Sequence, residues 1–229
     1  MTSNTASPLA RPFPAIPEIG GVTRRIARAR YKTWDRCDLT FMTFDEGTSV
    51  AGVLTQSKCP SSEVDWCREH LPQGKARALV VSAGNANAFT GRRGREAVEA
   101  VTARVAKHLQ CPVETVFVSA TGVIGVPLPI DKAEAGLDAA FLSSPCSWED
   151  AAATIMTTDT FPKGAVATAI IGEKTVNLAG IIKGSGMIAP DMATMLGYIV
   201  TDAAVEPGFL QRMISAANQE TFSCITVDS

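Results

Sequence analysis

One amphipathic helix between two apolar strands constrains the fold of this chain most strongly. Apolar residues recur through positions 94–110 at the spacing that places them on one helical face: Ala97, Val98, Val101, Val105 and Leu109. A short apolar run at residues 78–82 precedes this helix, and a run of β-branched and aromatic residues at 116–118 follows it. Both runs lead into glycine-containing turns, so we expect a buried sheet with helices packed on it.

Further elements are expected on both sides of this unit. The segment 36–56 alternates apolar and polar residues around a "DEG" turn and predicts a hairpin. Ser147, followed by Asp150, is a helix-capping pattern. Short helices are expected at 64–71, 131–142 and 207–220, a second hairpin at 164–172 and 174–184, and a strand at 197–203. Strands and helices alternate too irregularly for a doubly wound sheet, so the fold class is α/β or α+β, with sheet and helix layers in one domain.

Composition narrows the classes of partner. The chain has 229 residues, 46% hydrophobic and 19% charged, with a net charge of -2, as expected for a globular protein. This balance provides no global positive field for nucleic acid or an anionic membrane, and no run approaches the roughly 18 to 20 apolar residues that span a bilayer. Residues 1–20 open with a stretch rich in Ser, Thr and Pro, which we interpret as a flexible tail.

The cysteines and histidines do not suggest a metal site. Six cysteines are scattered without a CxxC pair, and the two histidines, His70 and His108, are expected on polar helix faces. A chain of this length with a good core does not need disulfides, so reduced thiols in a cytoplasmic protein are expected. No bound metal or cofactor is predicted.

Two glycine-containing loops could bind a ligand. Gly184, Gly186 and Ala189 fit the dinucleotide pattern GxGxxA, but Pro190 would break the helix that this motif requires. The loop "GNANAFTG" offers Asn85, Asn87 and Thr90 to a polar ligand, or uses them to cap its own backbone. Taken singly, each of these residues is interpreted as structural.

Thr194 lies in the stretch "KGSGMIAPDMATML" with no base or metal ligand beside it. A threonine hydroxyl becomes a nucleophile when a base takes its proton, and the α-amine of the same residue can serve as that base. Thr194 would own a free α-amine if the Ala193–Thr194 bond were cut, and its hydroxyl could itself attack the preceding carbonyl. The sequence permits this self-cleavage.

Four blocks carry a resemblance to a known family. "GNANAFTG", "SATGVIG", "MTTDTFPK" and "KGSGMIAPDMATML" resemble, in the same order, the glutamate N-acetyltransferase or ornithine acetyltransferase family of arginine biosynthesis. The resemblance implies a layered helix–sheet–sheet–helix sandwich similar to N-terminal-nucleophile hydrolases. It also implies self-cleavage before Thr194, an α2β2 assembly, and acetyl transfer from N-acetylornithine to glutamate, with acetyl-CoA as a further donor in some members.

The resemblance also assigns roles to single residues. Thr194 would be the nucleophile, and Thr121 with Gly122 would form the oxyanion hole. Thr157, Lys183 and Thr194 would bind the substrate. Residues 21–193 would then be the α-chain portion, and residues 194–229 a truncated start of the β-chain, because family members continue well beyond "ITVD". The alternative is a catalytically silent fragment that serves only as an assembly or binding module.

Overall fold

Two β-sheets form the centre of the computed structural model, which describes residues 10–184 and 195–225. The first sheet has the order β1 (Val22–Ala27), β2 (Leu39–Phe44), β3 (Ala78–Asn85) and β4 (Val116–Val123). Strands β1, β2 and β3 pair antiparallel, whereas β3 and β4 run parallel. This parallel pair brings the ends of β3 and β4 to the same edge of the sheet.

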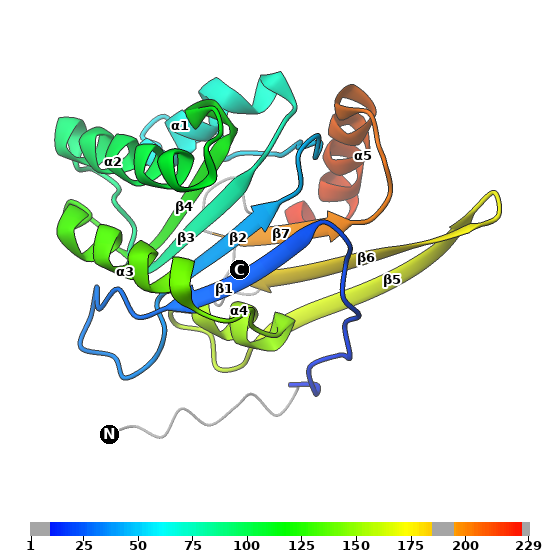
Figure 1. Ribbon diagram of the computed structural model, residues 1–229, viewed down its shortest axis with the longest axis horizontal. Helices are drawn as coiled ribbons and strands as arrows, with labels where there is room; N and C mark the ends of the chain where they lie inside the picture. The colour runs from blue at the N-terminus through cyan, green and yellow to red at the C-terminus, as the bar shows by residue number, and fades with distance from the viewer. Residues whose placement is uncertain (1–9, 185–194, 226–229) are drawn as a thin grey trace.

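The second sheet consists of β5 (Lys163–Ile171), β6 (Lys174–Lys183) and β7 (Leu196–Thr201), all antiparallel. The β5–β6 hairpin extends well beyond the body of the protein (Figure 1). At its base, Ala179 and Ile181 pack into the same core as Leu79 and Phe117 of the first sheet. The two sheets therefore stack face to face at one end and separate towards the hairpin tip.

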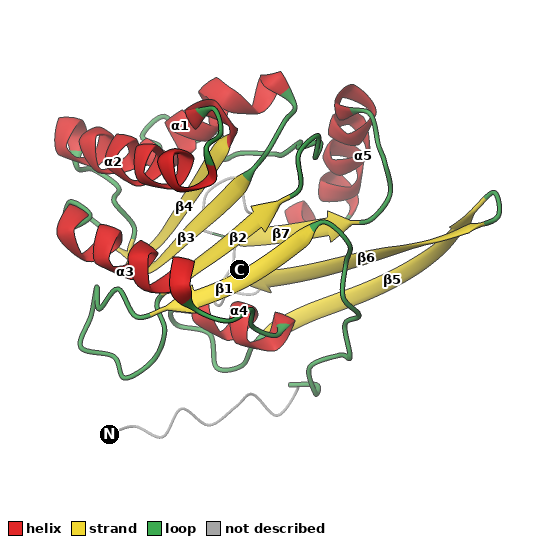
Figure 2. Ribbon diagram, viewed as in Figure 1, coloured by secondary structure: helices red, strands yellow, loops and turns green. Residues whose placement is uncertain are grey.

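Helices α2 (Gly91–Leu109) and α3 (Ile130–Leu142) cover the opposite face of the first sheet (Figure 2). The α-helices are α1 (Ser62–His70), α2 (Gly91–Leu109), α3 (Ile130–Leu142), α4 (Trp148–Thr154) and α5 (Pro207–Glu220). Short 3₁₀ turns lie at Leu71–Gln73, Val113–Thr115 and Phe222–Cys224. Helices α2 and α3 bury their apolar stripes against the first sheet, and α4 packs between β1 and the second sheet.

Strand β3 is buried on both faces, which explains its continuous apolar sequence. Ala78 and Val80 face the helices, whereas Leu79 and Val81 face the second sheet. All eight residues of β3 are buried, since a strand between two layers has no solvent face. The continuous apolar run of β3 therefore indicates both a strand and its position between two packed layers.

Most of the predicted elements are confirmed. The helix expected at 94–110 begins slightly earlier, at Gly91, and ends at Leu109. The helices expected at 64–71, 131–142 and 207–220 and the later hairpin are present with small shifts of their ends. Ser147 and Asp150 form the predicted capping box at the start of α4.

The early hairpin around the "DEG" turn was a wrong prediction. Strand β2 pairs with β1 on one side and β3 on the other, so neither edge is left for residues 50–56. Strand β1 was missed because Arg24 and Arg25 interrupt its apolar pattern. Arg24 is nevertheless 2% exposed, because its guanidinium lies 4.1 Å from the Trp148 ring centroid and pairs with Glu18.

Part of the predicted N-terminal tail packs on the body. Ile19 is buried in the core between the sheets, and Phe13 and Ile16 pack against the same cluster. The Trp148 indole N–H donates to the carbonyl of Pro17 at 3.2 Å. Residues 1–9 lie outside the described ranges.

Asp38 organises the turn between β1 and β2. Its buried carboxylate accepts hydrogen bonds from the backbone N–H groups of Ala29, Arg30 and Tyr31 at 2.7, 3.2 and 2.8 Å. Replacing Asp38 removes the acceptor for three N–H groups at once, two of which are in buried hydrogen bonds.

We expect Asp38→Ala to lower the free energy of unfolding by about 3 kcal/mol, because buried donors lose a charged acceptor. The measurement is urea unfolding followed by circular dichroism. Asp35→Ala is the matched control, since that side chain is 95% exposed in a surface pair with Arg28 and should cost at most about 1 kcal/mol. Equal losses for the two variants would contradict the structural role of Asp38.

Candidate active site

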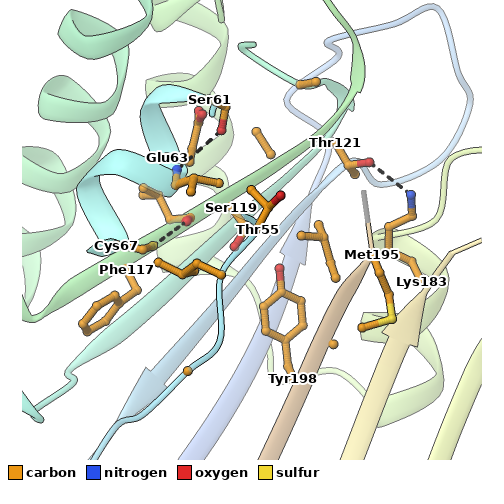
Figure 3. Close-up of a pocket in the computed structure, with 18 of the residues that line it drawn as sticks. Thr55, Ser61, Glu63, Cys67, Phe117, Ser119, Thr121, Lys183, Met195 and Tyr198 are labelled. Atoms are coloured by element: carbon orange, nitrogen blue, oxygen red, sulfur yellow. Dashed lines mark hydrogen bonds between the residues drawn. The ribbon is translucent and has the colours of Figure 1, made fainter. Parts of the chain in front are cut away.

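A cavity of about 960 Å³ lies where the two sheets separate. Strand β4 contributes Ser119 and Thr121, strand β6 contributes Lys183, and strand β7 contributes Tyr198 (Figure 3). The segment before α1 and the helix itself line part of the remaining wall, and α5 contributes Ile214 and Asn218. A concave site of this size with a few convergent polar groups is typical of a small-molecule pocket.

Thr121 and Lys183 join the two sheets at this cavity. Lys183 Nζ donates a hydrogen bond to Thr121 Oγ1 at 3.1 Å, and the two residues are only 4% and 2% exposed (Figure 3). Because the Thr121 oxygen accepts from an ammonium group, its own O–H is polarised and left to donate to another acceptor. The pair can therefore present a strong hydrogen-bond donor to a developing negative charge.

Gly122 follows directly and has a backbone conformation that favours glycine, with φ of +133°. A Cβ atom placed there would lie 2.3 Å from the backbone carbon of Gly84 and 2.7 Å from the Asn85 nitrogen. The ends of the parallel strands thus approach more closely than a side chain allows. This contact fixes where the Gly122 N–H lies relative to the Thr121 hydroxyl.

A buried carboxylate balances the charges behind this pair. Asp159 accepts from Lys163 Nζ at 2.6 Å and from the Gly184 N–H at 2.8 Å. Burial acts to raise the pKa of Asp159, but these two hydrogen bonds and the nearby lysines bring it below its ordinary value. Burial lowers the pKa of Lys183, and Asp159 opposes that effect. Sequence reasoning missed Asp159, because it lies in the irregular segment between α4 and β5, where no periodic pattern indicates burial.

The remaining predicted site residues fall into two groups. Thr157 is half-buried and lines the cavity. Met195, which was not among the predicted site residues, also lines it. Ala193 and Thr194 lie outside the described residues, and so do Gly186 and Ala189 of the dinucleotide pattern. The structure thus brings Thr121, Gly122, Lys183 and Thr157 to one cavity, whose wall includes the residue that follows Thr194 in the chain.

The asparagines of the 84–91 loop bind the protein itself. Asn85 Nδ2 donates to the carbonyl of Val126 at 3.0 Å, and Asn87 Oδ1 accepts from the Leu128 N–H at 3.1 Å. Thr90 Oγ1 donates to the Asn87 carbonyl at 2.7 Å. These side chains therefore join two loops, and the expected capping within the loop is also present, from the Asn87 N–H to Asn85 Oδ1 at 2.7 Å.

The cysteines and histidines show no metal site in the described ranges, where no three ligating side chains cluster. All six cysteines are free, and burial raises the pKa of Cys67 at the cavity wall to about 11. The prediction of a polar-face position was wrong for His70, which is half-buried with its ring 4.3 Å from that of Trp66. His108 is exposed and stacks on Phe141 at 3.7 Å.

Comparison with known proteins identifies the family. The model of the ArgJ family matches residues 23–229, which is most of the chain. The chain belongs to the ArgJ family. No helix in the described ranges of this ArgJ chain has the length and apolar character needed to cross a membrane.

Relatives show how much of an ArgJ protein the chain spans. It is 60% identical over 224 residues to the arginine biosynthesis bifunctional protein ArgJ of Zymomonas mobilis, covering 97% of this chain and 55% of that protein. It is 50% identical over 230 residues to the protein of that name from Mesorhizobium japonicum, covering 99% and 55%. The chain therefore spans about half the length of these relatives.

Two solved structures are similar to the ArgJ fold described here. A Bacillus halodurans ArgJ crystal structure matches with a TM-score of 0.69 and 30% identity, over 78% of this chain and 92% of that one. The Mycobacterium tuberculosis ornithine acetyltransferase complexed with ornithine matches with a TM-score of 0.65 and 28% identity, over 78% and 94%. The predicted α/β architecture with stacked sheets, similar to N-terminal-nucleophile hydrolases, is confirmed.

The contact at Gly122 gives a direct stability test. We expect Gly122→Ala to lower the free energy of unfolding by about 3 kcal/mol, because the new methyl group would collide with backbone atoms of the neighbouring strand. Thermal and urea unfolding measure the loss.

Gly125→Ala is the matched control, because Gly125 also has a positive φ, of +82°, but nothing lies within 4 Å of the point that its Cβ atom would occupy. Backbone strain alone should cost this control about 1 kcal/mol. If both variants lose the same amount, the close approach of the two strands is not the cause.

Proposed function

We propose that this chain carries most of the active site of an acetyltransferase of arginine biosynthesis, with Thr194 as its nucleophile. The observation that supports this best is the buried Thr121–Lys183 hydrogen bond beside Gly122, in a cavity whose wall includes Met195. Thr194 precedes Met195 in the chain, and the proposal therefore assigns the nucleophile and the oxyanion-stabilising pair to the same cavity. The protein is proposed to act in the cytoplasm.

The nucleophile would be generated by cleavage of the Ala193–Thr194 bond. The Thr194 hydroxyl attacks the Ala193 carbonyl carbon, the C–N bond breaks, and the acyl group moves from nitrogen to oxygen. Water then hydrolyses this ester, leaving a carboxylate on Ala193 and a free α-amine on Thr194. An α-amine has a pKa of about 7.7 to 8, so a useful fraction of it is unprotonated at neutral pH and can accept a proton.

Acetyl transfer would then take two steps. The Thr194 oxygen attacks the acetyl carbon of N-acetylornithine while its proton passes to the α-amine, and the tetrahedral intermediate collapses with that proton leaving on the ornithine amine. The glutamate amine attacks the resulting ester, forms N-acetylglutamate and restores the hydroxyl. The Thr121 O–H and the Gly122 N–H would stabilise the negative oxygen in both steps.

Substrate contacts would come from Thr157, Lys183 and Thr194. The Lys183 ammonium suits a carboxylate or carbonyl oxygen, since it keeps two donors beyond the one given to Thr121. No resident cofactor is required by this chemistry, although acetyl-CoA could supply acetyl groups as a co-substrate. Residues 21–193 would form the α-portion and residues 194–229 the start of the β-portion of an α2β2 assembly.

A second candidate function is favoured by the share of its relatives' length that the chain covers. Since it covers 55% of the length of its relatives, further site residues could be supplied by a segment that this chain does not contain. The chain would then be a catalytically silent module for assembly or binding.

Self-cleavage is tested by intact mass spectrometry. We expect the 24.1 kDa chain to split between Ala193 and Thr194, and Thr194→Ala to remain uncleaved because it lacks the attacking hydroxyl. Thr201→Ala, a neighbouring threonine on β7, is the control and should still be cleaved. A wild-type chain that stays intact under native conditions favours the silent module.

Acetyl transfer is tested with N-acetylornithine and labelled glutamate. The chain is assayed alone and together with the remaining segment of the Zymomonas mobilis relative. We expect Thr194→Ala to abolish transfer and Thr121→Val to lower kcat about 100-fold, because one oxyanion donor contributes on this scale. Equal rates for wild type and Thr194→Ala would rule out the nucleophile assignment.

A further inference from the structure

Glu63 is a buried carboxyl group that the proposed mechanism does not use. It lies in the first turn of α1, is 3% exposed and faces the inner part of the cavity. Its Oε2 has no hydrogen-bond partner among the residues that the structure describes. A buried carboxyl group left half-satisfied carries a free-energy cost, so its retention calls for an explanation.

The other oxygen of Glu63 holds Asn87. Glu63 Oε1 accepts from Asn87 Nδ2 at 2.9 Å, and the same amide group donates to the Gly94 carbonyl at 3.0 Å. Asn87 is fully buried and has a positive φ of +48°, which is uncommon for a residue other than glycine. Glu63 therefore fixes the orientation of a strained residue in the loop after β3.

Asn87 in turn joins this loop to the segment that follows the proposed oxyanion hole. Its Oδ1 accepts from the Leu128 N–H at 3.1 Å. The backbones of the two loops also bond directly, from Ala86 N to the Val123 carbonyl and from Gly125 N to the Ala88 carbonyl, each at 2.9 Å. Ala86 precedes Asn87 in the chain and Val123 follows Gly122, so one backbone hydrogen bond and two covalent links connect Asn87 with Gly122.

Among the ionisable groups around Glu63, its own carboxyl group is the one that changes charge near neutral pH. Burial raises the pKa of Glu63 to about 7, and the hydrogen bond from Asn87 acts in the opposite direction. The ionisable groups facing it are Cys67 on α1 and Tyr31 before β2, and burial raises the pKa of both, so they remain neutral at pH 7.

The other elements around Glu63 present uncharged side chains. A small space beside its carboxyl group is bounded by Val98 and Val101 of α2, Val80 and Ser82 of β3, Val118 and Ser119 of β4, and Leu128. An ionised Glu63 would thus hold Asn87 by a stronger, charge-assisted hydrogen bond while carrying an unpaired buried charge.

We propose that Glu63 is a positioning residue: its carboxyl group sets the position of Gly122 through Asn87, and gain or loss of its proton is transmitted to the Gly122 backbone. This inference rests on the proposed function and deepens it, because it assigns control of the oxyanion hole to a residue that has no part in the proposed chemical steps. Transfer activity would consequently depend on the protonation of Glu63 through kcat rather than through KM.

The experiment is an NMR titration of the 229-residue chain with labelled glycine and glutamate, across the pKa of about 7. We expect the Gly122 Cα signal to shift with the same midpoint as the Glu63 side-chain carbon. In Glu63→Gln, which keeps the shape and the acceptor for Asn87, the Gly122 signal should no longer shift at that midpoint. Asp65→Asn, an exposed site on the same helix, is the control and should titrate as wild type.

A second variant and a second measurement keep the inference testable if Glu63→Gln fails to fold. In Asn87→Ala, Glu63 should still titrate, but Gly122 should stop following it. Because the pKa of Glu63 is raised in the folded state, proton binding by Glu63 stabilises the fold. This contribution is complete below pH 4.5, the ordinary pKa, and is lost as the pH rises through about 7. The Tm of wild type should therefore fall across that window relative to the Tm of Glu63→Gln.

The two hypotheses fail separately. Co-titration of Glu63 and Gly122 in a chain without transfer activity would support the positioning role and count against the proposed function. A Gly122 signal that is flat, or that titrates with a midpoint different from that of Glu63, would overturn the positioning role whatever the activity. In an active enzyme, a kcat profile unchanged by Glu63→Gln would also overturn it.

Discussion

The contact between the Gly84 and Gly122 backbones determines how the rest of the site can be arranged. Two parallel strands end side by side with no room for a Cβ atom between them. Thr121 is thereby held near the end of β4, where Lys183 of the second sheet reaches it. The cross-sheet hydrogen bond, the cavity and the loop network all follow from this close approach.

A few charged side chains lie around the end of β4, close to this contact. A buried ammonium is costly unless it is solvated by protein groups, and Lys183 finds a hydroxyl in front and the Asp159 carboxylate in its neighbourhood. Asp159 itself is bound by Lys163 and by the backbone at Gly184. The site therefore contains a preorganised positive region whose members are fixed by both sheets, as electrostatic stabilisation of an anion requires.

The sequence predicted the elements whose patterns arise from burial on one or both faces. Helix α2 was found because its apolar residues form a single stripe, and strand β3 because its short apolar run leads into a glycine-containing turn. Strand β1 was missed because Arg24 is buried by stacking on Trp148, a tertiary contact that no local pattern reveals.

The proximity of Thr121 and Lys183, 62 positions apart, likewise depends on how the two sheets stack. Their proposed roles came from family resemblance. Glu63 shares a helical face with Trp66 and Cys67, and that spacing was the available signal for its burial.

The projecting hairpin affects how the chain behaves in solution. Ile170 and Ile171 at its tip are 77% and 62% exposed, and within the described ranges β5 pairs with β6 alone. An apolar strand with an open edge is a template for pairing with another copy, and beyond Lys163 at its start β5 has no charge or proline to prevent it. Pairing through this edge would join two molecules, so self-association by this route would rise with the concentration of the chain.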